Sequence, residues 1–249
     1  MISNTPIVIY THSDEAFIWK VTIGQILKHA SGIDVHFVYN DSFTQIDEVD
    51  IPSNWTLHTY DDTTPWTKRV NKVLKEIPSE YVLFVHEDWL LTGDTNDMII
   101  DDMVEFMKAH HVDYLLSYSH YSITDAQQGI DIGYPEYFAY KENGHIMQPA
   151  IWKHSVFSEF TDTLNKTKSE NEDEDCLTFM RNKSCYSVQN LATVRTIRTM
   201  NALFFPHMHA LTQNKWHSTK YPKLLPLIES YGIDTSTRSA HPWWELDTQ

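Results

Sequence analysis

The chain has little cysteine and little positive charge. Only Cys176 and Cys185 are present among 249 residues, too few for a disulfide framework and without the spacing of a thiolate metal site. A reducing compartment is therefore expected. Lys and Arg number 19 against 34 Asp and Glu, which gives a formal net charge of -15. Because the basic residues are scattered, a nucleic-acid backbone would be repelled, and we expect no nucleic-acid partner.

Long apolar runs, repeats and low-complexity segments are also missing. Near the N-terminus the apolar run Ile7 to Tyr10 is much shorter than a signal-peptide core or a membrane span. Two triplets, at 54–56 and 165–167, match the glycosylation sequon, which has meaning only on a secretory route. We expect a cytoplasmic protein with no transmembrane segment, and leave open a loose attachment to a membrane surface.

What the sequence does contain is a hydrophobic content of 41% and an aromatic content of 13%, typical of a globular chain. Short β-branched runs alternate with segments of helical period, which predicts βαβ units and a mostly parallel sheet flanked by helices. We expect one α/β domain over 1–249. The expected strands are 7–10, 35–39, 57–60, 81–85 and 114–116, and the expected helices are 17–29, 65–77 and 97–110.

The second half has a weaker pattern. Residues 117–142 are rich in Tyr, Ser, Asp and Gly and predict substrate-facing loops with short antiparallel strands. Helices are expected over 152–164, 174–180 and 221–231. At 64–65 a Thr-Pro pair predicts a helix start, with Thr64 as the cap and proline in the first turn.

Two adjacent acids follow the most apolar strand. Residues 81–85 are apolar throughout and predict a central strand buried on both faces. Glu87 and Asp88 come just after it, where ligands bind in open α/β sheets. A carboxylate at that position is costly to desolvate unless a cation compensates it, and Mg²⁺ and Mn²⁺ prefer such oxygen ligands together with phosphates. The alternative is a solvated turn completed by Gly93 and Asp94.

A second acidic group occupies 172–175 and precedes an expected helix. The helix dipole favours acids in a first turn, which explains the run without any function. A carboxylate there could equally accept the proton of an acceptor hydroxyl. Trp152, at an expected helix start, is either a core residue or a contact for a sugar.

The fourteen histidines include a closely spaced pair that could bind a metal. His207 and His209 would point to one side of a strand. Without a third close ligand we do not expect a zinc site there, and favour surface or core histidines.

Several segments in order resemble bacterial and viral glycosyltransferases of the GT-A fold, including lipopolysaccharide-biosynthesis types. That family shows an early strand followed by an acid, a Trp and an Arg on a helix, and a hydrophobic strand that ends in Glu-Asp. The matching residues here are Asp14, Trp66, Arg69 and Glu87-Asp88. Further similarity covers Gln148–Trp152, the acids at 172–175, and the closing segments 215–216, 221–222 and 231–234.

The resemblance implies a GT-A-like single domain, with a nucleotide-sugar-binding half (1–116) and an acceptor-binding half (117–249). It implies that Asp88, with Glu87, binds a divalent metal, Mn²⁺ or Mg²⁺. Asp14, Trp66, Arg69 and Glu87 would bind the donor. Our alternative interpretations are a helix cap for Asp14 and an exposed salt bridge for Arg69.

The resemblance also implies acceptor contacts from Gln148 and Trp152. The general base would be Asp175 or Glu174, with Glu172-Asp173 as the other register. His86-Glu87-Asp88 replaces the familiar Asp-x-Asp pattern, which leaves the number of direct metal ligands open.

The implied activity is transfer of a sugar from a nucleotide-diphosphate donor to a glycan, glycolipid or other hydroxyl acceptor, with inversion. The alternatives are a metal-dependent hydrolase or nucleotidyltransferase, which usually needs more convergent ligands, and a non-catalytic carbohydrate-binding protein, which the aromatic content alone would allow.

Overall fold

A nine-stranded sheet runs through the part of the chain that the structure, a computed structural model, describes: residues 5–118, 129–141, 149–164, 174–190, 199–212 and 215–240. The strand order is β3-β2-β1-β4-β9-β6-β10-β8-β7. The strands are β1 Ile7–Tyr10, β2 Val35–Asn40, β3 Thr56–Tyr60, β4 Tyr81–His86, β6 Tyr114–Leu116, β7 Ile130–Asp131, β8 Tyr137–Lys141, β9 Ala150–Lys153 and β10 Cys185–Asn190.

Most strands of this sheet point the same way. β3, β2, β1 and β4 are mutually parallel, and β6 is parallel to β10. β9 is antiparallel to both β4 and β6, and β8 is antiparallel to β10 and β7. Seven of the nine strands in this sheet, all except β8 and β9, share one direction. The expected α/β class with a mixed, mostly parallel sheet is confirmed.

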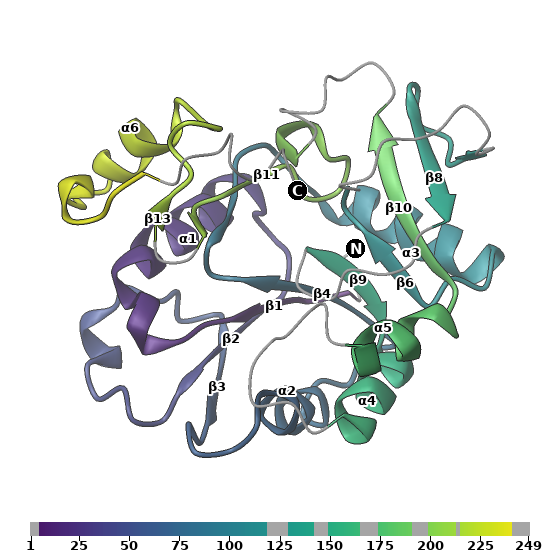
Figure 1. Ribbon diagram of the computed structural model, residues 1–249, viewed down its shortest axis with the longest axis horizontal. Coiled ribbons are helices and arrows are strands. Elements are labelled where there is room, and N and C mark those ends of the chain that lie inside the picture. Colours follow the sequence, from purple (N-terminus) through teal and green to yellow (C-terminus); the bar gives the residue numbers. More distant parts are fainter. Residues whose placement is uncertain are drawn as a thin grey trace.

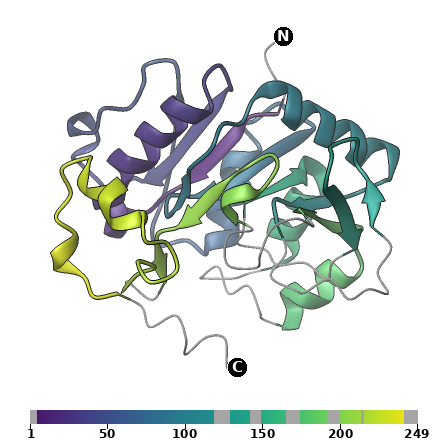
Figure 2. The same cartoon turned by 90° about the horizontal axis from the view of Figure 1, so that it is seen from above.

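Helices cover both faces of the sheet (Figure 1). α1 (Ala16–His29) and α3 (Asp97–Ala109) lie on one face, as Figure 2 shows, and pack on Ile9, Phe37 and Leu83 in one hydrophobic cluster. α2 (Trp66–Leu74), α4 (His154–Thr163) and α5 (Glu174–Arg181) share the other cluster with alternate strand residues such as Val8 and Val82. Because strand side chains alternate in direction, one apolar strand supplies both layers.

Smaller elements close the fold beside the sheet. β5 (Trp89–Leu91) pairs with β11 (His207–His209), and β12 (Leu211–Thr212) pairs with β13 (Lys215–Trp216). The expected tail helix is present as the shorter α6 (Leu224–Glu229), with Leu224 and Ile228 buried. These elements bring the C-terminal part of the chain against α1.

Two local expectations are wrong. Trp152 lies on β9 and not at a helix start, because α4 begins two residues later at His154. Thr64 does not cap α2, because its hydroxyl donates to the carbonyl of Asp61 at 2.8 Å. Pro65 precedes the first residue of α2.

Gly24 lets the C-terminal segment approach α1. A Cβ at this position would lie 2.3 Å from Cε1 of Tyr231, whose hydroxyl accepts a hydrogen bond from Nε2 of Gln25 at 2.7 Å. We expect Gly24→Ala to lower the free energy of unfolding by about 1–3 kcal/mol, because overpacking outweighs the gain in helix propensity. Denaturant titration measures this. In a Tyr231→Ala background the same change should be neutral or stabilising, and an equal loss in both backgrounds would contradict the packing explanation.

Candidate functional site

Polar side chains gather at one edge of the sheet, where β1, β2, β3 and β4 end. These four strands are parallel, so their carboxyl ends meet at the same edge, which is where open α/β sheets bind ligands. The residues that the strands deliver there are His12, Ser13 and Glu15 after β1, Asn40 and Ser42 at the end of β2, Asp62 after β3, and His86, Glu87 and Asp88 at the end of β4. We call this set the carboxyl-edge site.

Glu87 is buried and ties the loop after β1 to the end of β4. Its side chain accepts a hydrogen bond from the backbone N–H of His12 at 2.9 Å, and its carbonyl accepts one from Thr22 Oγ1 at 2.5 Å. Burial, followed by the charge of Asp88, raises the pKa of Glu87 well above its usual value. The neutral form of this side chain is thereby favoured, and its hydrogen bond from His12 ties the loop after β1 to the end of β4.

Asp88 is the charged acid of the pair. Its Oδ2 lies 2.8 Å from Nε2 of His209, and its carbonyl accepts a hydrogen bond from the N–H of Ala210 at 2.7 Å. Burial is the largest single influence and acts to raise the pKa of Asp88. The charge and hydrogen bond of His209, together with the charge of His86 and a backbone hydrogen bond, outweigh burial, and the pKa ends below its usual value. Asp88 therefore keeps a negative charge at this edge.

His209 reaches Asp88 because β11 pairs with β5, which sets His209 opposite Trp89. The imidazole stacks on the indole with centroids 4.1 Å apart and an interplanar angle of 5°. His217 lies beside it at 5.0 Å between centroids. The sequence predicts a core or surface histidine at 209, and the structure instead sets His209 against Asp88. The alternation His-Met-His on a short strand is the signal in the sequence that points to it.

Other titratable groups crowd around Asp88. Burial lowers the pKa of His86 to about 4, and its Nε2 is buried without a hydrogen-bond partner. Burial also raises the pKa of Glu15 to about 7; Arg238 opposes this, and Asp88 and Asp14 reinforce it. Poorly solvated acids that raise one another's pKa values are typical of functional sites.

A second network lies beside Glu87 and is centred on Asp62. Asp62 Oδ2 accepts hydrogen bonds from Asn40 Nδ2 at 3.0 Å and Ser42 Oγ at 2.5 Å. Its Oδ1 lies 3.3 Å from Nε2 of His12 and 3.9 Å from Nη1 of Arg69. His12 therefore joins the ends of β1, β3 and β4 through its backbone and its ring.

Arg69 holds the loop between β3 and α2 in place. Its side chain is 13% exposed, and it donates to the carbonyls of Thr64, at 2.7 Å, and Asp62. The guanidinium also lies 5.0 Å from the ring centroid of Tyr60. Arg69 is therefore not an exposed salt bridge, and part of its hydrogen-bonding capacity is used on the protein's own backbone.

Asp14 is at the same edge but points to solvent. Its carboxylate is 87% exposed and lies 3.5 Å from Nδ1 of His12. The ring of His12 accepts a hydrogen bond from the N–H of Asp14 at 3.2 Å, so His12 and not Asp14 caps this turn. The helix-cap interpretation of Asp14 is therefore wrong.

The two candidate tryptophans belong to the core. Trp152 has no exposed surface and stacks on Phe157 with centroids 4.4 Å apart. Trp66 is 5% exposed and meets Phe84 edge to face. We therefore correct the sequence prediction and assign Trp152 to the core rather than to the acceptor, and Trp66 to the core rather than to the donor.

The remaining candidates are only partly described. Asp175 is exposed in the first turn of α5, whose Cys176 and Met180 are buried in the second cluster. Glu174 begins α5, but its side chain is outside the described part, as are Gln148 and the pair Glu172-Asp173. Asp175 is thus the one candidate base whose surroundings are known.

The carboxyl-edge site fits a metal ion that takes most of its ligands from a substrate. Within the described residues no group of three or more His, Cys, Asp or Glu side chains is arranged to hold a metal. Asp88 and His209, however, present a carboxylate oxygen and an imidazole nitrogen 2.8 Å apart. Mg²⁺ and Mn²⁺ often use one or two protein ligands together with phosphate oxygens and water, and Asp88 and His209 would supply two such ligands once Nε2 of His209 is without a proton.

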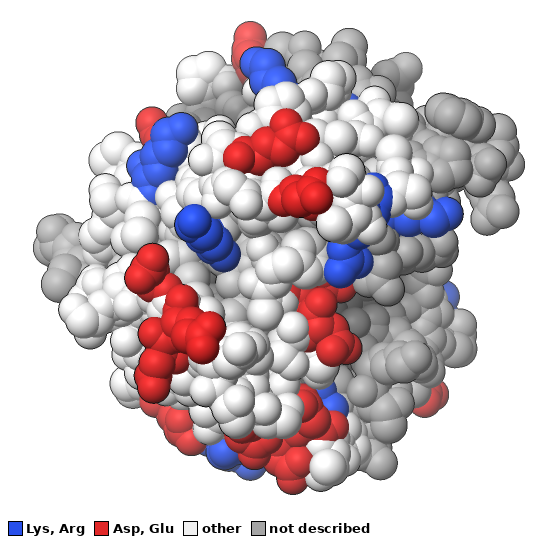
Figure 3. Space-filling view, turned by 90° about the vertical axis from the view of Figure 1, so that its left-hand side faces the viewer, with Lys and Arg blue, Asp and Glu red and all other residues white. Residues whose placement is uncertain are grey.

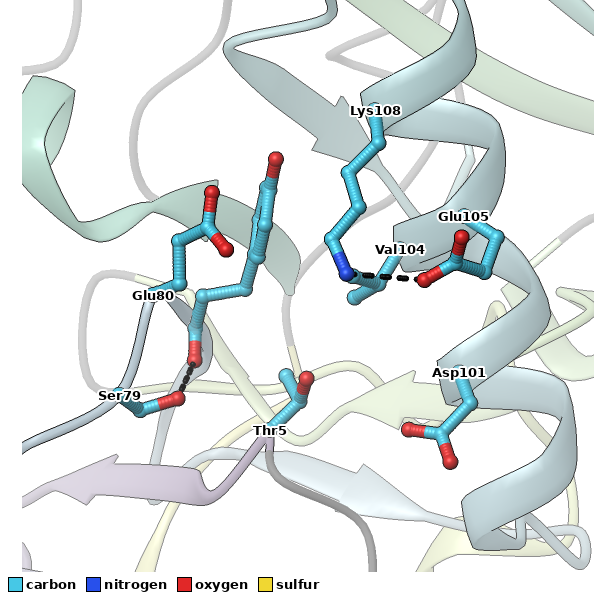
Figure 4. A pocket seen from close by; sticks show the side chains of 8 residues that line it. Thr5, Ser79, Glu80, Asp101, Val104, Glu105 and Lys108 are labelled. Atoms are coloured by element: carbon cyan, nitrogen blue, oxygen red, sulfur yellow. Dashed lines mark hydrogen bonds and ion pairs between the residues drawn. The ribbon is translucent and has the colours of Figure 1, made fainter.

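A hollow of about 320 Å³ lies at the opposite edge of the sheet, beside the starts of β1 and β4 (Figure 4). It is lined by Glu80, Asp101 and Glu105, with Lys108 donating to Glu105 at 2.8 Å. Three acids against one occupied lysine would repel a diphosphate. The hollow is therefore a poor candidate for a phosphate-bearing ligand.

The distribution of charge on the surface matches the expectation from the sequence that the basic residues are scattered. On the face shown in Figure 3, Lys and Arg are scattered among more numerous acids and form no continuous stripe. In the part of the chain that the structure describes, no helix combines the length and apolarity that crossing a lipid bilayer requires.

The fold and the site define a mixed α/β protein with polar and ionisable side chains gathered at the carboxyl edge of its parallel strands. No protein-family model matches the chain, and no curated protein matches it either. Among solved structures it is similar to S. aureus TarS residues 1–349 in complex with UDP, with a TM-score of 0.48 and 14% identity over 94% of this chain and 68% of that one. A second crystal structure of S. aureus TarS has a TM-score of 0.44 and 19% identity over 80% of this chain and 40% of that one.

Proposed function

We propose that this chain is a glycosyltransferase that moves a sugar from a nucleotide-diphosphate donor to a hydroxyl of a glycan or glycolipid, with inversion. The observation that carries the proposal is the ionised Asp88, paired with His209, at the tip of the central strand β4. It is supported by the order of the acid, Trp-Arg and Glu-Asp segments in the sequence.

A divalent cation, Mn²⁺ or Mg²⁺, would be held by Asp88 and His209, and when bound would neutralise the diphosphate leaving group. The chain's own residues shape the space around it. Glu87 fixes the loop after β1 by accepting from His12, and Trp89 orients His209 by stacking. The position of the imidazole is therefore set before any ligand binds, which lowers the cost of ordering.

The donor would lie along the carboxyl ends of β1 to β4. Asp62, Asn40 and Ser42 supply acceptors and donors at the ends of β2 and β3. Arg69 stabilises the loop that carries Asp62, and the exposed carboxylate of Asp14 stands at the outer side of the same edge. In this proposal Asp14 and Arg69 belong to the donor half, Arg69 mainly by positioning.

The acceptor hydroxyl would lose its proton to a carboxylate as the bond to the sugar forms. Asp175, exposed at the start of α5, is our preferred base, with Glu174 as the alternative.

The proposal is tested first by donor binding, which needs no acceptor. Thermal shift with a panel of nucleoside diphosphates should show stabilisation in the presence of Mn²⁺ and little after chelation with EDTA, because a bound ligand stabilises in proportion to its saturation. Nucleotide sugars should then be consumed only when an acceptor is present. Release of free sugar without an acceptor would favour the hydrolase alternative, and binding of free glycans with no diphosphate effect would favour a carbohydrate-binding protein.

A further inference from the structure

Four titratable side chains form a hydrogen-bonded chain at the far end of α2, away from the carboxyl-edge site. His36 on β2 and His58 on β3 join Nδ1 to Nε2 at 2.7 Å. Nδ1 of His58 lies 2.7 Å from the carboxylate of Glu76, which follows α2. Nε2 of His36 lies 3.3 Å from the carboxylate of Asp34. Both histidines are buried, whereas Asp34 and Glu76 reach solvent.

The geometry limits how many protons the chain can hold. An ionised Glu76 can only accept, so His58 carries its proton on Nδ1 and uses Nε2 to accept from Nδ1 of His36. Nε2 of His36 is then unprotonated and faces Asp34. One further proton fits there, between imidazole and carboxylate. A second would set N–H against N–H across the 2.7 Å contact between the rings.

The surroundings offer little else to stabilise charge. Burial lowers the pKa of His36, against the opposing effect of Asp34. On β1 the register partner of His36 is Val8, which is apolar. From α2 the nearby cation is Lys72, whose Nζ donates to the carbonyl of Thr59 on β3 at 2.9 Å. Near neutral pH the two hydrogen bonds His36–His58 and His58–Glu76 are therefore complete with both rings uncharged, and Nε2 of His36 faces Asp34 without a proton.

We propose that the chain Asp34–His36–His58–Glu76 is a pH-sensitive latch that fastens the end of α2 to β2 and β3 and releases it on acidification. The opposite end of α2 carries Arg69, which holds the loop with Asp62 in place. Loosening of the latch would therefore reach the carboxyl-edge site through one helix. The latch itself does not depend on the proposed activity.

Acidification should destabilise the folded chain, because the folded chain binds fewer protons than the unfolded chain. In the unfolded chain both histidines take up protons near pH 6.5. The folded chain takes up fewer, because His36 has a lowered pKa and a second proton meets the first across the ring contact. The unfolded state then binds more protons, so stability is present at pH 7.5 and falls as the pH drops through about 6.5.

The test compares melting temperatures at pH 7.5 and pH 5.5 for the wild type and the double variant His36→Phe/His58→Phe. Phenylalanine keeps two stacked rings on the strands and removes the titration. We expect the wild type to lose about 3–5 °C more than the double variant over this interval. His29→Gln is the matched control, because His29 also meets a carboxylate, Asp94 at 2.7 Å, but lies at the end of α1, on the other face of the sheet from α2; it should keep the wild-type loss.

Hydrogen exchange locates the release. The amides of Lys75, Glu76 and Ile77 bond to carbonyls of α2, and after correction for intrinsic rates they should exchange about tenfold faster at pH 5.5 than at pH 7.5. The double variant should show no such change. Glu76→Gln, which retains an acceptor for His58, is the variant to use if the double variant does not fold. The fall in its melting temperature from pH 7.5 to pH 5.5 should differ from that of the wild type. Equal pH dependence in wild type and folded variants, or unchanged exchange at 75–77, would overturn the proposal.

Discussion

Asp88→Asn should lower donor turnover by about 10²- to 10³-fold, the range expected when one well-placed charge partner of a developing negative charge is lost. Asparagine keeps the size of the side chain and its contact with His209, but not the charge that the pairing with His209 maintains. The stabilisation of the protein by a nucleoside diphosphate with Mn²⁺ should fall with it. Initial rates with a nucleotide sugar and thermal shift measure the two effects.

The control for this experiment is Asp94→Asn. Asp94 forms a His–Asp contact of nearly the same length, 2.7 Å to His29, but it lies on the surface beyond β5. Its removal should leave donor turnover within a factor of two and change stability by less than about 1 kcal/mol. Unchanged turnover in folded Asp88→Asn protein would contradict both the metal and the transferase proposals.

Trp152→Ala should be among the most destabilising single changes, at about 3–5 kcal/mol. The side chain has no exposed surface and packs between Tyr114 and Phe157, so its loss leaves a large cavity in the cluster under α2 and α4. For a chain of this length the melting temperature should fall by about 6–20 °C. Thermal unfolding followed by circular dichroism measures this.

Trp152→Phe separates packing from substrate contact. It fills most of the cavity and should recover more than half of the lost stability. If Trp152 only packs, KM for an acceptor should be the same in this variant as in the wild type. A raised KM with stability restored would return Trp152 to the acceptor site.

The order of elements was predictable because each early strand has its own local signal. The run at 81–85 is apolar on both faces, and the helix after Pro65 repeats its apolar residues at helical spacing. Such patterns fix which face is buried without reference to the rest of the chain. Placement of Glu87 and Asp88 at the carboxyl edge follows from the direction of β4 alone.

The sequence predictions for Trp152 and Arg69 differ from the structure because contacts between distant or irregular segments decide where these side chains lie. The sequence places Trp152 at a helix start because a short apolar stretch suits a strand or a helix start equally well. In the structure, pairing of β9 with both β4 and β6 makes it a strand residue. The sequence predicts a ligand contact or a surface ion pair for Arg69, because its backbone partners are set by the loop around Asp62 and have no signal in the sequence.

The sequence alone predicts the α/β class and the strands that bring polar residues to one edge of the sheet. It also predicts that an acidic pair follows the most buried strand. All three depend on local periodicity. Only the tertiary structure decided which acid of that pair is charged. Burial and the neighbouring charge of Asp88 favour neutral Glu87, against the hydrogen bond from His12, whereas His209, 121 residues further on, lowers the pKa of Asp88. A pKa depends on what is packed around a group in space, and no periodicity in the chain encodes that neighbour.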